Sequence, residues 1–215
     1  MKEYSIRKIL RSCLILIPRI YVKFSNFYNK LLLWAYGVKV GHNAYIMGNI
    51  YICLMKGARM IIGDDFLMLS GSGINPISRN LRAAIYASEG AKITIGNNVG
   101  MSSPCIWAKE SITICDGVNI GAGCTILDTD CHNMDWRVRA ARETTLEGIS
   151  VDCSTAKSAP VLICENAWIG AGVTVLKGVT IGARSIIAAG SVVTKSIPAD
   201  CLAGGNPARV IRKLQ

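Results

Sequence analysis

The sequence predicts an all-β fold, a parallel β-helix of hexapeptide repeats with a short helical segment before it and a protruding loop within it. Branched aliphatic residues recur at every sixth position over residues 163–193, and small or β-branched residues recur two positions before the later ones. A period of six fits neither the period of an α-helix nor the alternation of a strand. It fits a coil with three short faces, in which one aliphatic residue per face points inward and stacked coils bury a continuous column. The aliphatic positions are Ile163, Ile169, Val175, Ile181, Ile187 and Val193.

Residues 1–36 are expected to form a basic amphipathic helical segment, because their apolar residues follow helical spacing. Pro18 is expected to break or bend the first helix, and a second helix is expected to end near Gly37. Basic residues outnumber the single acidic Glu3 here, so we expect an anionic partner near the N-terminus and no nucleic-acid groove along the protein. The apolar positions are Ile6, Ile9, Leu10, Cys13, Leu14 and Ile17.

The β-helix domain is expected to span residues 37–203. Its register is regular at Ile114, Ile120 and Ile126, and again early in the domain. Between these stretches the register is looser, which implies insertions at corners, and residues 75–89 are expected to form one such excursion. The early and looser positions are Val40, Ile46, Ile52, Ile62, Met68, Ile74, Ile95, Met101 and Trp107.

Residues 127–160 lack the repeat and are expected to form an extended loop. The loop is rich in polar residues, among them Asp128, Asp130, His132 and Asp135. Long excursions from a compact solenoid are usually functional. After the last coil, residues 204–215 are expected to form a C-terminal tail beside it.

Composition narrows the class of protein. Of the 215 residues 51% are hydrophobic, yet no apolar run is long enough to span a bilayer. The longest run, Cys13–Ile17, ends at Pro18 and is followed by no signal-peptidase site, so we expect a cytoplasmic protein. The nine cysteines form no C-x-x-C pair, and we expect reduced, packed thiols. With only two histidines and no clustered ligands, no metal site is expected.

Several strings of the sequence match a known family. They are Ala167–Gly172, Gly190–Lys195, Ile197–Asp200, Ala203–Arg212 and Leu127–His132. With them, residues 90–215, and more weakly 37–90, resemble the hexapeptide-repeat acetyltransferases of the galactoside and maltose O-acetyltransferase type. The resemblance implies a homotrimer of left-handed β-helices, an exception to the right-handed crossover rule. It also implies that acetyl-CoA lies in a groove between neighbouring helices, with the acceptor hydroxyl near a histidine.

The resemblance assigns the catalytic role to His132. Acetyl transfer to a hydroxyl requires a base, because an alcohol is a weak nucleophile near neutral pH, and imidazole suits this role. Cys131 is not expected to be a nucleophile, because the family transfers acetyl directly, and His42 is expected to be structural. The residues implied to bind the cofactor are Trp168, Ala171, Ala189, Thr194, Lys195, Arg209 and Arg212.

Acceptor recognition departs from the family pattern. Met101-Ser102-Ser103 stands where the family has an acceptor-binding asparagine, and Lys109 stands near an expected aspartate. Asp128, Asp130 and Asp135 are therefore candidates to orient the histidine or bind the acceptor. Further candidate acceptor-binding residues are Ser102, Ser103, Asn75, Arg79 and Asn80.

The resulting prediction is an acetyl-CoA-dependent O-acetyltransferase of a saccharide. Two alternatives stay open, an N-acetyltransferase of an amino sugar or antibiotic and a non-catalytic β-helix scaffold. The basic segment 1–36 can lie on the inner face of an anionic membrane, which would suit a lipid-linked acceptor in capsule or O-antigen synthesis. The alternative for this segment is packing on the solenoid or on a neighbouring subunit.

Overall fold

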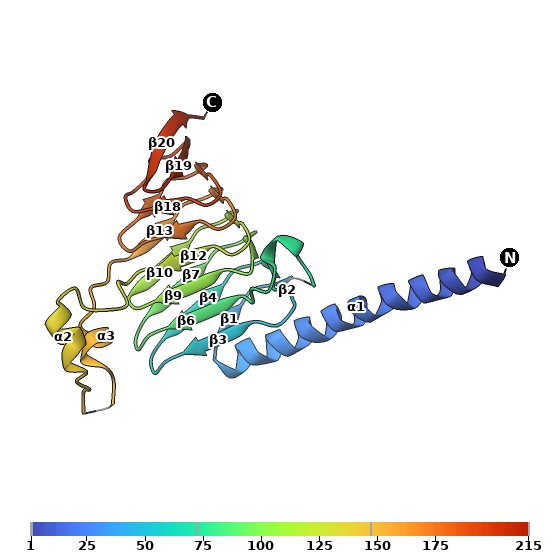
Figure 1. The fold of residues 1–215 in the computed structure, drawn as a ribbon, viewed down its shortest axis with the longest axis horizontal. Coiled ribbons are helices and arrows are strands. Elements are labelled where there is room, and N and C mark those ends of the chain that lie inside the picture. The colour runs from blue at the N-terminus through green and yellow to red at the C-terminus, as the bar shows by residue number, and fades with distance from the viewer. Residues whose placement is uncertain (1, 72, 147, 215) are drawn as a thin grey trace.

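The computed structural model describes residues 2–71, 73–146 and 148–214, and its strands stack into a three-sided prism (Figure 1). Each coil contributes one strand to each of three sheets, named A, B and C here in the order in which the chain visits them. Within the prism every strand pairs in parallel with the strand of the next coil. A parallel β-helix results, as the period of six predicts.

The strands of each sheet belong to successive coils, except that β20 returns antiparallel beside β19. Sheet A contains β1 (Lys39–Val40), β4 (Arg59–Ile62), β7 (Lys92–Ile95), β10 (Ser111–Ile114), β13 (Val161–Ile163) and β16 (Thr180–Ile181). Sheet B contains β2 (Tyr45–Met47), β5 (Leu67–Leu69), β8 (Gly100–Ser102), β11 (Asn119–Ile120), β14 (Trp168–Ile169), β17 (Ile186–Ile187), β19 (Cys201–Gly205) and β20 (Ala208–Lys213). Sheet C contains β3 (Tyr51–Leu54), β6 (Ala84–Ala87), β9 (Cys105–Ala108), β12 (Thr125–Leu127), β15 (Thr174–Val175) and β18 (Val192–Val193).

Inward-facing aliphatic residues form the core, one from each strand. In sheet A, Ile114 is paired in register with Ile95 on one side and with Ile163 on the other, and each side chain is at most 1% exposed. All six positions read from Ile163 to Val193 are fully buried. Burying such a side chain contributes about 1.5–3 kcal/mol, so the columns are the main source of stability. The prediction of the inward register over 163–193 is therefore confirmed.

Three of the early and looser positions are not buried, namely Val40, Ile74 and Trp107, and Val40 is 37% exposed in the first coil. Trp107 was expected to face inward, but it is 38% exposed and its neighbour Ile106 takes the buried position. Ile74 lies in an excursion between β5 and β6, and Ile85 occupies the inward site of that coil. The aliphatic spacing slips there because residues 70–83 leave the coil and contain a short 3-10 helix, η1 (Pro76–Ser78).

Glycines at the corners allow consecutive coils to stack closely. A Cβ on Gly121 would lie 2.5 Å from the backbone nitrogen of Ala171, and one on Gly170 would lie 2.6 Å from that of Ala189. Both glycines lie at corners between sheets B and C, which are called the B–C corners below. The corners that lead from sheet C back to sheet A are called the C–A corners.

Helix α1 (Lys2–Ala35) closes the first coil and then runs away from the prism (Figure 1). Its Asn29 donates to the carbonyl of Gly48 at 2.7 Å, and Asn26 accepts the N–H of Ile46 at 2.9 Å. These bonds cover the open edge of β2, which would otherwise be free to pair with another chain. The helix continues through Pro18, where a break or bend was expected. The side chains of residues 2–6 and 9–19, which include the apolar positions Ile6 to Ile17, lie outside the described part of the structure.

The opposite end of the prism carries a hairpin. β19 pairs in parallel with β17, and β20 then returns antiparallel to β19, so residues 204–215, expected as a tail, largely belong to the hairpin. β20 presents Arg209, Arg212 and Lys213 on its exposed surface. Charged side chains on an edge strand discourage pairing between molecules.

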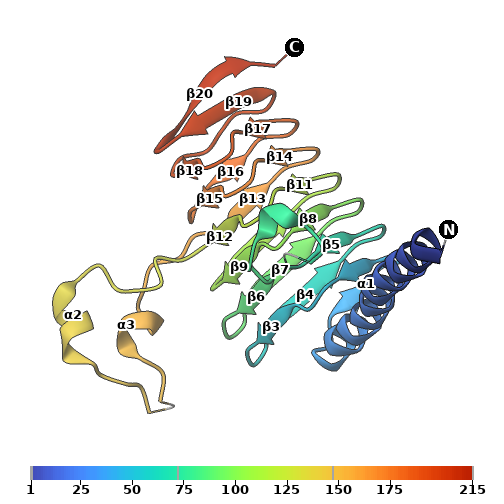
Figure 2. The same ribbon diagram turned by 45° about the vertical axis from the view of Figure 1, so that its right-hand side comes forward.

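The extended loop leaves the prism at a C–A corner, between β12 and β13. It contains α2 (Trp136–Ala141) and α3 (Val151–Ser154), and both views show it projecting from sheet C (Figures 1 and 2). Thr129 and Ser158 form an antiparallel bridge where the two arms of the loop meet. The loop therefore has a defined base on the prism.

Candidate active site

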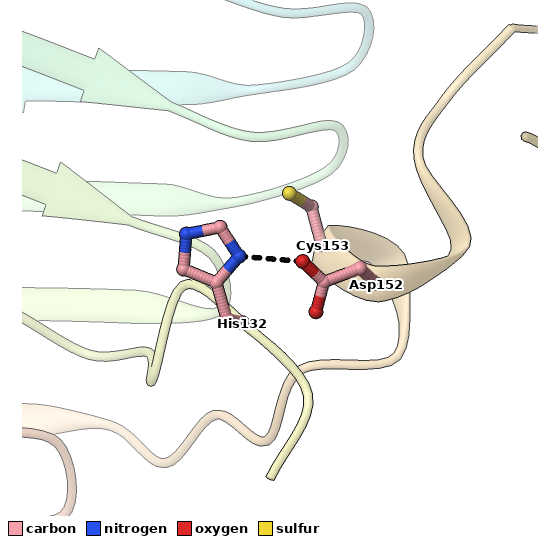
Figure 3. Close-up of side chains that lie close together, drawn as sticks. All are labelled: His132, Asp152 and Cys153. Carbon is pink, nitrogen blue, oxygen red and sulfur yellow. Dashed lines mark hydrogen bonds and ion pairs between the residues drawn. The ribbon is translucent and has the colours of Figure 1, made fainter. Parts of the chain in front are cut away.

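The predicted catalytic histidine forms a close pair with an aspartate from the far arm of the loop. His132 Nδ1 lies 2.6 Å from Asp152 Oδ2 (Figure 3). The side chain of His132 is 64% exposed and that of Asp152 is 13% exposed. The imidazole is thus held at one nitrogen and open to an incoming molecule at the other.

A tight turn presents His132 from the near arm of the loop. Its N–H donates to the carbonyl of Asp130 at 2.7 Å, which closes a three-residue turn around Cys131. Cys131 has φ 62°, a conformation that is uncommon for a residue with a side chain. Such conformations cost of order 1–3 kcal/mol and cluster at functional sites.

Asp152 lies in the first turn of α3 and is fixed by two groups. Its Oδ2 accepts from His132, and its Oδ1 accepts the backbone N–H of Asn133 at 2.7 Å. Asn133 is also tied to Thr155 by a side-chain hydrogen bond of 2.8 Å. The two arms of the loop are therefore linked through Asn133 as well as through the pair.

Lys109 anchors the other end of α3 to the prism. Its Nζ donates to the carbonyls of Cys153, Ser154 and Ala156, at 2.9, 2.8 and 2.6 Å. A cation at the C-terminal carbonyls of a helix is a favourable arrangement. This lysine stands where an aspartate was expected by resemblance, and it orients the helix that carries Asp152.

The electrostatics of the pair favour an ionised aspartate. The hydrogen bond from His132 is the main cause that lowers the pKa of Asp152; burial opposes it, and the N–H of Asn133 lowers the pKa further. A carboxylate accepts and does not donate, so Nδ1 of the neutral imidazole carries the proton. Nε2 is then left with a free lone pair, which is the arrangement that a general base requires.

The aspartates predicted to orient the ring have other partners. Asp128 is fully buried, and its carboxylate accepts the N–H groups of Lys109 and Glu110 at 2.6 and 2.7 Å. Burial raises the pKa of Asp128 against these hydrogen bonds. Asp130 forms an ion pair of 2.9 Å with Lys177, and Asp135 caps α2 and pairs with Arg137.

Asp152 was missed by sequence reasoning. It is 20 residues from His132 in the sequence, and a loop without a repeat gives no rule for which residues meet across it. One local signal was present, because Asp152 follows Ser150 in a Ser-x-Asp string at the start of a short helix. Acidic residues are common in first helical turns, so this signal indicates a helix start and not a catalytic partner.

A cysteine and a hollow lie close to the pair. The Cys153 sulfur lies within 4.8 Å of a ring nitrogen of His132 and of an oxygen of Asp152, so these three residues bring together ligand atoms that could hold a metal ion. A hollow of about 310 Å³ lies between sheet C and the loop, with Cys153 and Cys131 in its wall. Tyr86 and Trp107 form its floor, in edge contact with ring centroids 5.0 Å apart. Burial raises the pKa of the Cys131 thiol, which disfavours a thiolate there.

The candidate cofactor residues divide between different parts of one chain. Ala171 and Ala189 lie at B–C corners, where the N–H of Gly190 donates to the carbonyl of Ala171 at 2.8 Å. Thr194 and Lys195 lie at a C–A corner, the same edge of the prism from which His132 projects. Trp168 is 56% exposed on sheet B, and Arg209 and Arg212 lie on β20.

The candidate acceptor residues divide in the same way. Ser102 ends β8 at a B–C corner, and its hydroxyl accepts from Asn75 at 3.1 Å. Asn80 is exposed on the excursion nearby. Asp128 and Asp130 belong to the C–A corner beneath the loop. A three-sided prism keeps its corners apart, so a single chain does not gather all the predicted site residues.

Comparison with known proteins gives consistent matches. Residues 160–195 match the family model "Bacterial transferase hexapeptide (six repeats)". The maltose O-acetyltransferase of Clostridium difficile 630 is 30% identical, over 71% of this chain and 68% of that chain, with a TM-score of 0.52. A galactoside acetyltransferase in complex with coenzyme A is 26% identical, over 93% of this chain and 80% of that chain, with a TM-score of 0.53. These likenesses confirm the predicted fold class, a left-handed parallel β-helix.

A similar protein is also found in fungi. The Saccharomyces cerevisiae protein YJL218W, named as an acetyltransferase, is 35% identical over 136 residues. The match spans 60% of this chain and 60% of the yeast protein.

Proposed function

The chain belongs to the hexapeptide-repeat acetyltransferases, and from this we propose that it transfers the acetyl group of acetyl-CoA to a hydroxyl of a saccharide. The observation that carries the proposal is the pair formed by His132 and Asp152, 2.6 Å apart. An exposed imidazole held by a carboxylate at Nδ1 is suited to proton transfer at Nε2.

The chemistry follows from this arrangement. His132 Nε2 accepts the proton of the acceptor hydroxyl while its oxygen attacks the thioester carbonyl. Asp152 stabilises the imidazolium that forms, because the pKa of its carboxyl is lowered and it stays ionised. When the carbon–sulfur bond breaks, the imidazolium returns its proton to the leaving thiolate, and His132 is regenerated.

The B–C corners offer a place for the donor. The corners of successive coils form a column of small residues, because the N–H of Gly172 donates to Ala122 and the N–H of Gly190 donates to Ala171, both at 2.8 Å. Without large side chains, an extended pantetheine arm could lie against the backbone there. We propose that its phosphates lie toward Arg209 and Arg212 near the end of the prism, because guanidinium groups suit phosphates. The thioester then points along the column toward Ala122.

We propose that the site is completed between copies in a homotrimer. The column of small residues lies at the B–C corners, whereas His132 projects from a C–A corner. A closed ring of three prisms can bring the B–C corners of one copy to the C–A corner of the next. Lys195 and Thr194 would then face a cofactor that lies on the neighbouring copy.

The exposed face of α1 supports contact with a membrane and so a lipid-linked acceptor, as in capsule or O-antigen synthesis. Phe24, Phe27 and Trp34 are 68%, 67% and 74% exposed, on the face opposite the fully buried Ser25 and Asn29. Lysines at positions 23 and 30 flank this face. Aromatic residues beside lysines are suited to the interface of anionic lipid. Among helices of the described residues, none is long and apolar enough to cross a membrane.

The test is release of the CoA thiol from acetyl-CoA in the presence of a panel of sugars. Transfer to hydroxyls by the unmodified protein, reduced roughly 10²–10⁴-fold in His132→Ala with CoA affinity retained, is the expected result. His42→Ala serves as the matched control and should retain full activity. Transfer only to amino sugars would instead support an N-acetyltransferase, and CoA binding without turnover on any acceptor would support a scaffold.

A further inference from the structure

The excursion of residues 70–83 forms one wall of a hollow at the B–C corners. The hollow has a volume of about 580 Å³. Ile77, Arg79 and Leu81 line it on the side of the excursion, and the other side consists of the corners of the next coils, Ala122–Gly123 and Ala171–Gly172. The hollow therefore lies at the Ala122 end of the column of small residues described above.

The excursion is held against the prism at both of its ends and at its middle. Ser70 Oγ accepts the N–H of Ala83 at 3.0 Å, and the N–H of Gly71 donates to Ser103 Oγ at 3.0 Å. Asn75 is bonded to Ser102 on β8. Beyond η1, Leu81 packs so closely on Gly123 that a Cβ at that glycine would lie 2.9 Å from Leu81 Cδ1. The described residues of the wall are thus tied to the prism at several points.

The wall is positively charged. The sequence has no acidic residue between Asp65 and Glu89, whereas the excursion carries Arg79 and Arg82. Arg82 lies over the ring of Tyr51, 5.7 Å from its centroid. Arg79 is exposed, and no carboxylate of the described residues forms an ion pair with it. Its guanidinium is therefore available to an anion in the hollow.

The backbone of Arg79 is in an unfavourable conformation. Its backbone angles are φ 49° and ψ −123°, which residues other than glycine rarely adopt. Such a conformation persists where the surrounding structure enforces it and often accompanies function. Here the hydrogen bonds on both sides of η1 hold Arg79 at the hollow.

From these observations we infer that the hollow binds an anionic saccharide acceptor, with Arg79 pairing to its carboxylate or phosphate. The inference rests on the proposed function, because the hollow can hold an acceptor only if the thioester of acetyl-CoA lies near Ala122, as proposed above. The phosphates of the donor would lie at the other end, near Arg209 and Arg212, so they do not compete for Arg79. Arg79 is then a residue that determines specificity and not part of the proton transfer.

The experiment compares three probes that differ in charge: a methyl glucuronide, glucose 6-phosphate and neutral methyl glucoside. Binding is measured by titration in the presence of CoA, and acetylation by thiol release, for the unmodified protein, Arg79→Gln and Arg59→Gln. Arg59 is an exposed arginine on β4, outside the hollow. We expect the unmodified protein and Arg59→Gln to prefer at least one anionic probe by roughly tenfold or more, and Arg79→Gln to lose this preference with CoA affinity retained.

The outcomes separate the two proposals. Equal binding of charged and neutral probes by the unmodified protein would overturn the inference, and so would an unchanged preference in Arg79→Gln. If the probes are still acetylated in either case, the proposed function stands. Preferential binding of an anionic probe through Arg79, without acetylation of any probe, would support the anionic site and count against the proposed function. The carboxylate and phosphate probes together identify which anion the site takes.

Discussion

The buried carboxylate of Asp128 accepts the backbone N–H of Lys109 at 2.6 Å, directly beneath the loop that carries the pair of His132 and Asp152. The side chain of the same lysine donates to three carbonyls at the end of α3. One residue thus connects a coil of the β-helix to the helix that presents Asp152. We expect the geometry of the pair to depend on this connection.

Replacing Lys109 with methionine is expected to lower kcat about ten- to a hundredfold, because α3 loses its anchor and Asp152 shifts relative to His132. The acceptor and donor sites are not altered directly, so CoA affinity should stay near that of the unmodified protein. Lys109→Arg should restore part of the activity, and Lys92→Met, at an exposed lysine on β7, is the matched control. Steady-state kinetics with an unchanged kcat in Lys109→Met would show that the anchor has no role.

Replacing Asp152 with asparagine is expected to reduce acetyl transfer about a hundredfold or more. An amide cannot stabilise the imidazolium as a carboxylate does, and it does not fix the same tautomer. Asp200→Asn is a suitable control, because Asp200 also has a lowered pKa and pairs with Arg184 away from the loop. Transfer rates measured for both variants at saturating acetyl-CoA would test the role of Asp152.

The same pair predicts a pH dependence of stability. The pKa of Asp152 is lower in the folded protein than its ordinary value, so the pair stabilises the fold above about pH 4. This contribution is lost as the pH falls through the lowered pKa. The difference in thermal midpoint between the unmodified protein and Asp152→Asn should therefore shrink as the pH falls below about 4. A difference that does not shrink in that range would contradict the assignment.

A site shared between copies predicts complementation. His132→Ala lacks the base, and Ala189→Trp would block the column of small residues, so each variant alone should be inactive. In a mixed trimer, one of the three sites combines an intact His132 from one copy with an intact column from the next, so the isolated mixed trimers should show about a third of the activity. Co-expression with two affinity tags isolates the mixed species. Inactive mixed trimers would place the whole site within one chain.

The aromatic face of α1 predicts binding to anionic lipid. The full chain should float with vesicles that contain about 30% phosphatidylserine, because lysines lie beside the aromatic face. With neutral vesicles it should stay unbound at the bottom of the gradient. Replacing Phe24, Phe27 and Trp34 together with serine should abolish flotation. Val210→Ser with Ile211→Ser removes exposed apolar residues on β20 and is the control. Equal flotation of both sets would remove α1 from membrane contact.

The repeat and the pair differ in how far the sequence could predict them. The inward position of Ile163 and its equivalents follows from a local period, because each coil contacts only its neighbours. His132 could be predicted as the base because it lies where the loop breaks that period and because residues 127–132 resemble the histidine stretch of the family. Asp152 could not, because its approach to His132 depends on how two arms of an irregular loop meet and on Lys109. Trp107 was assigned inward because a step of six residues from Met101 was assumed, whereas the buried Ile106 follows Met101 after five, and no local signal marks the missing residue.

The two ends of the prism are closed by different devices, the polar residues of α1 at β2 and the hairpin β19–β20 at the other end. Every coil between them presents the same three faces to the coils above and below. A whole coil of three hexapeptides could therefore be inserted or removed without changing either closure. The height of the prism, and with it the distance between the cationic end and the hollow beside Arg79, could change in steps of one coil. The length of the prism can thus vary without a change in the residues that close its two ends.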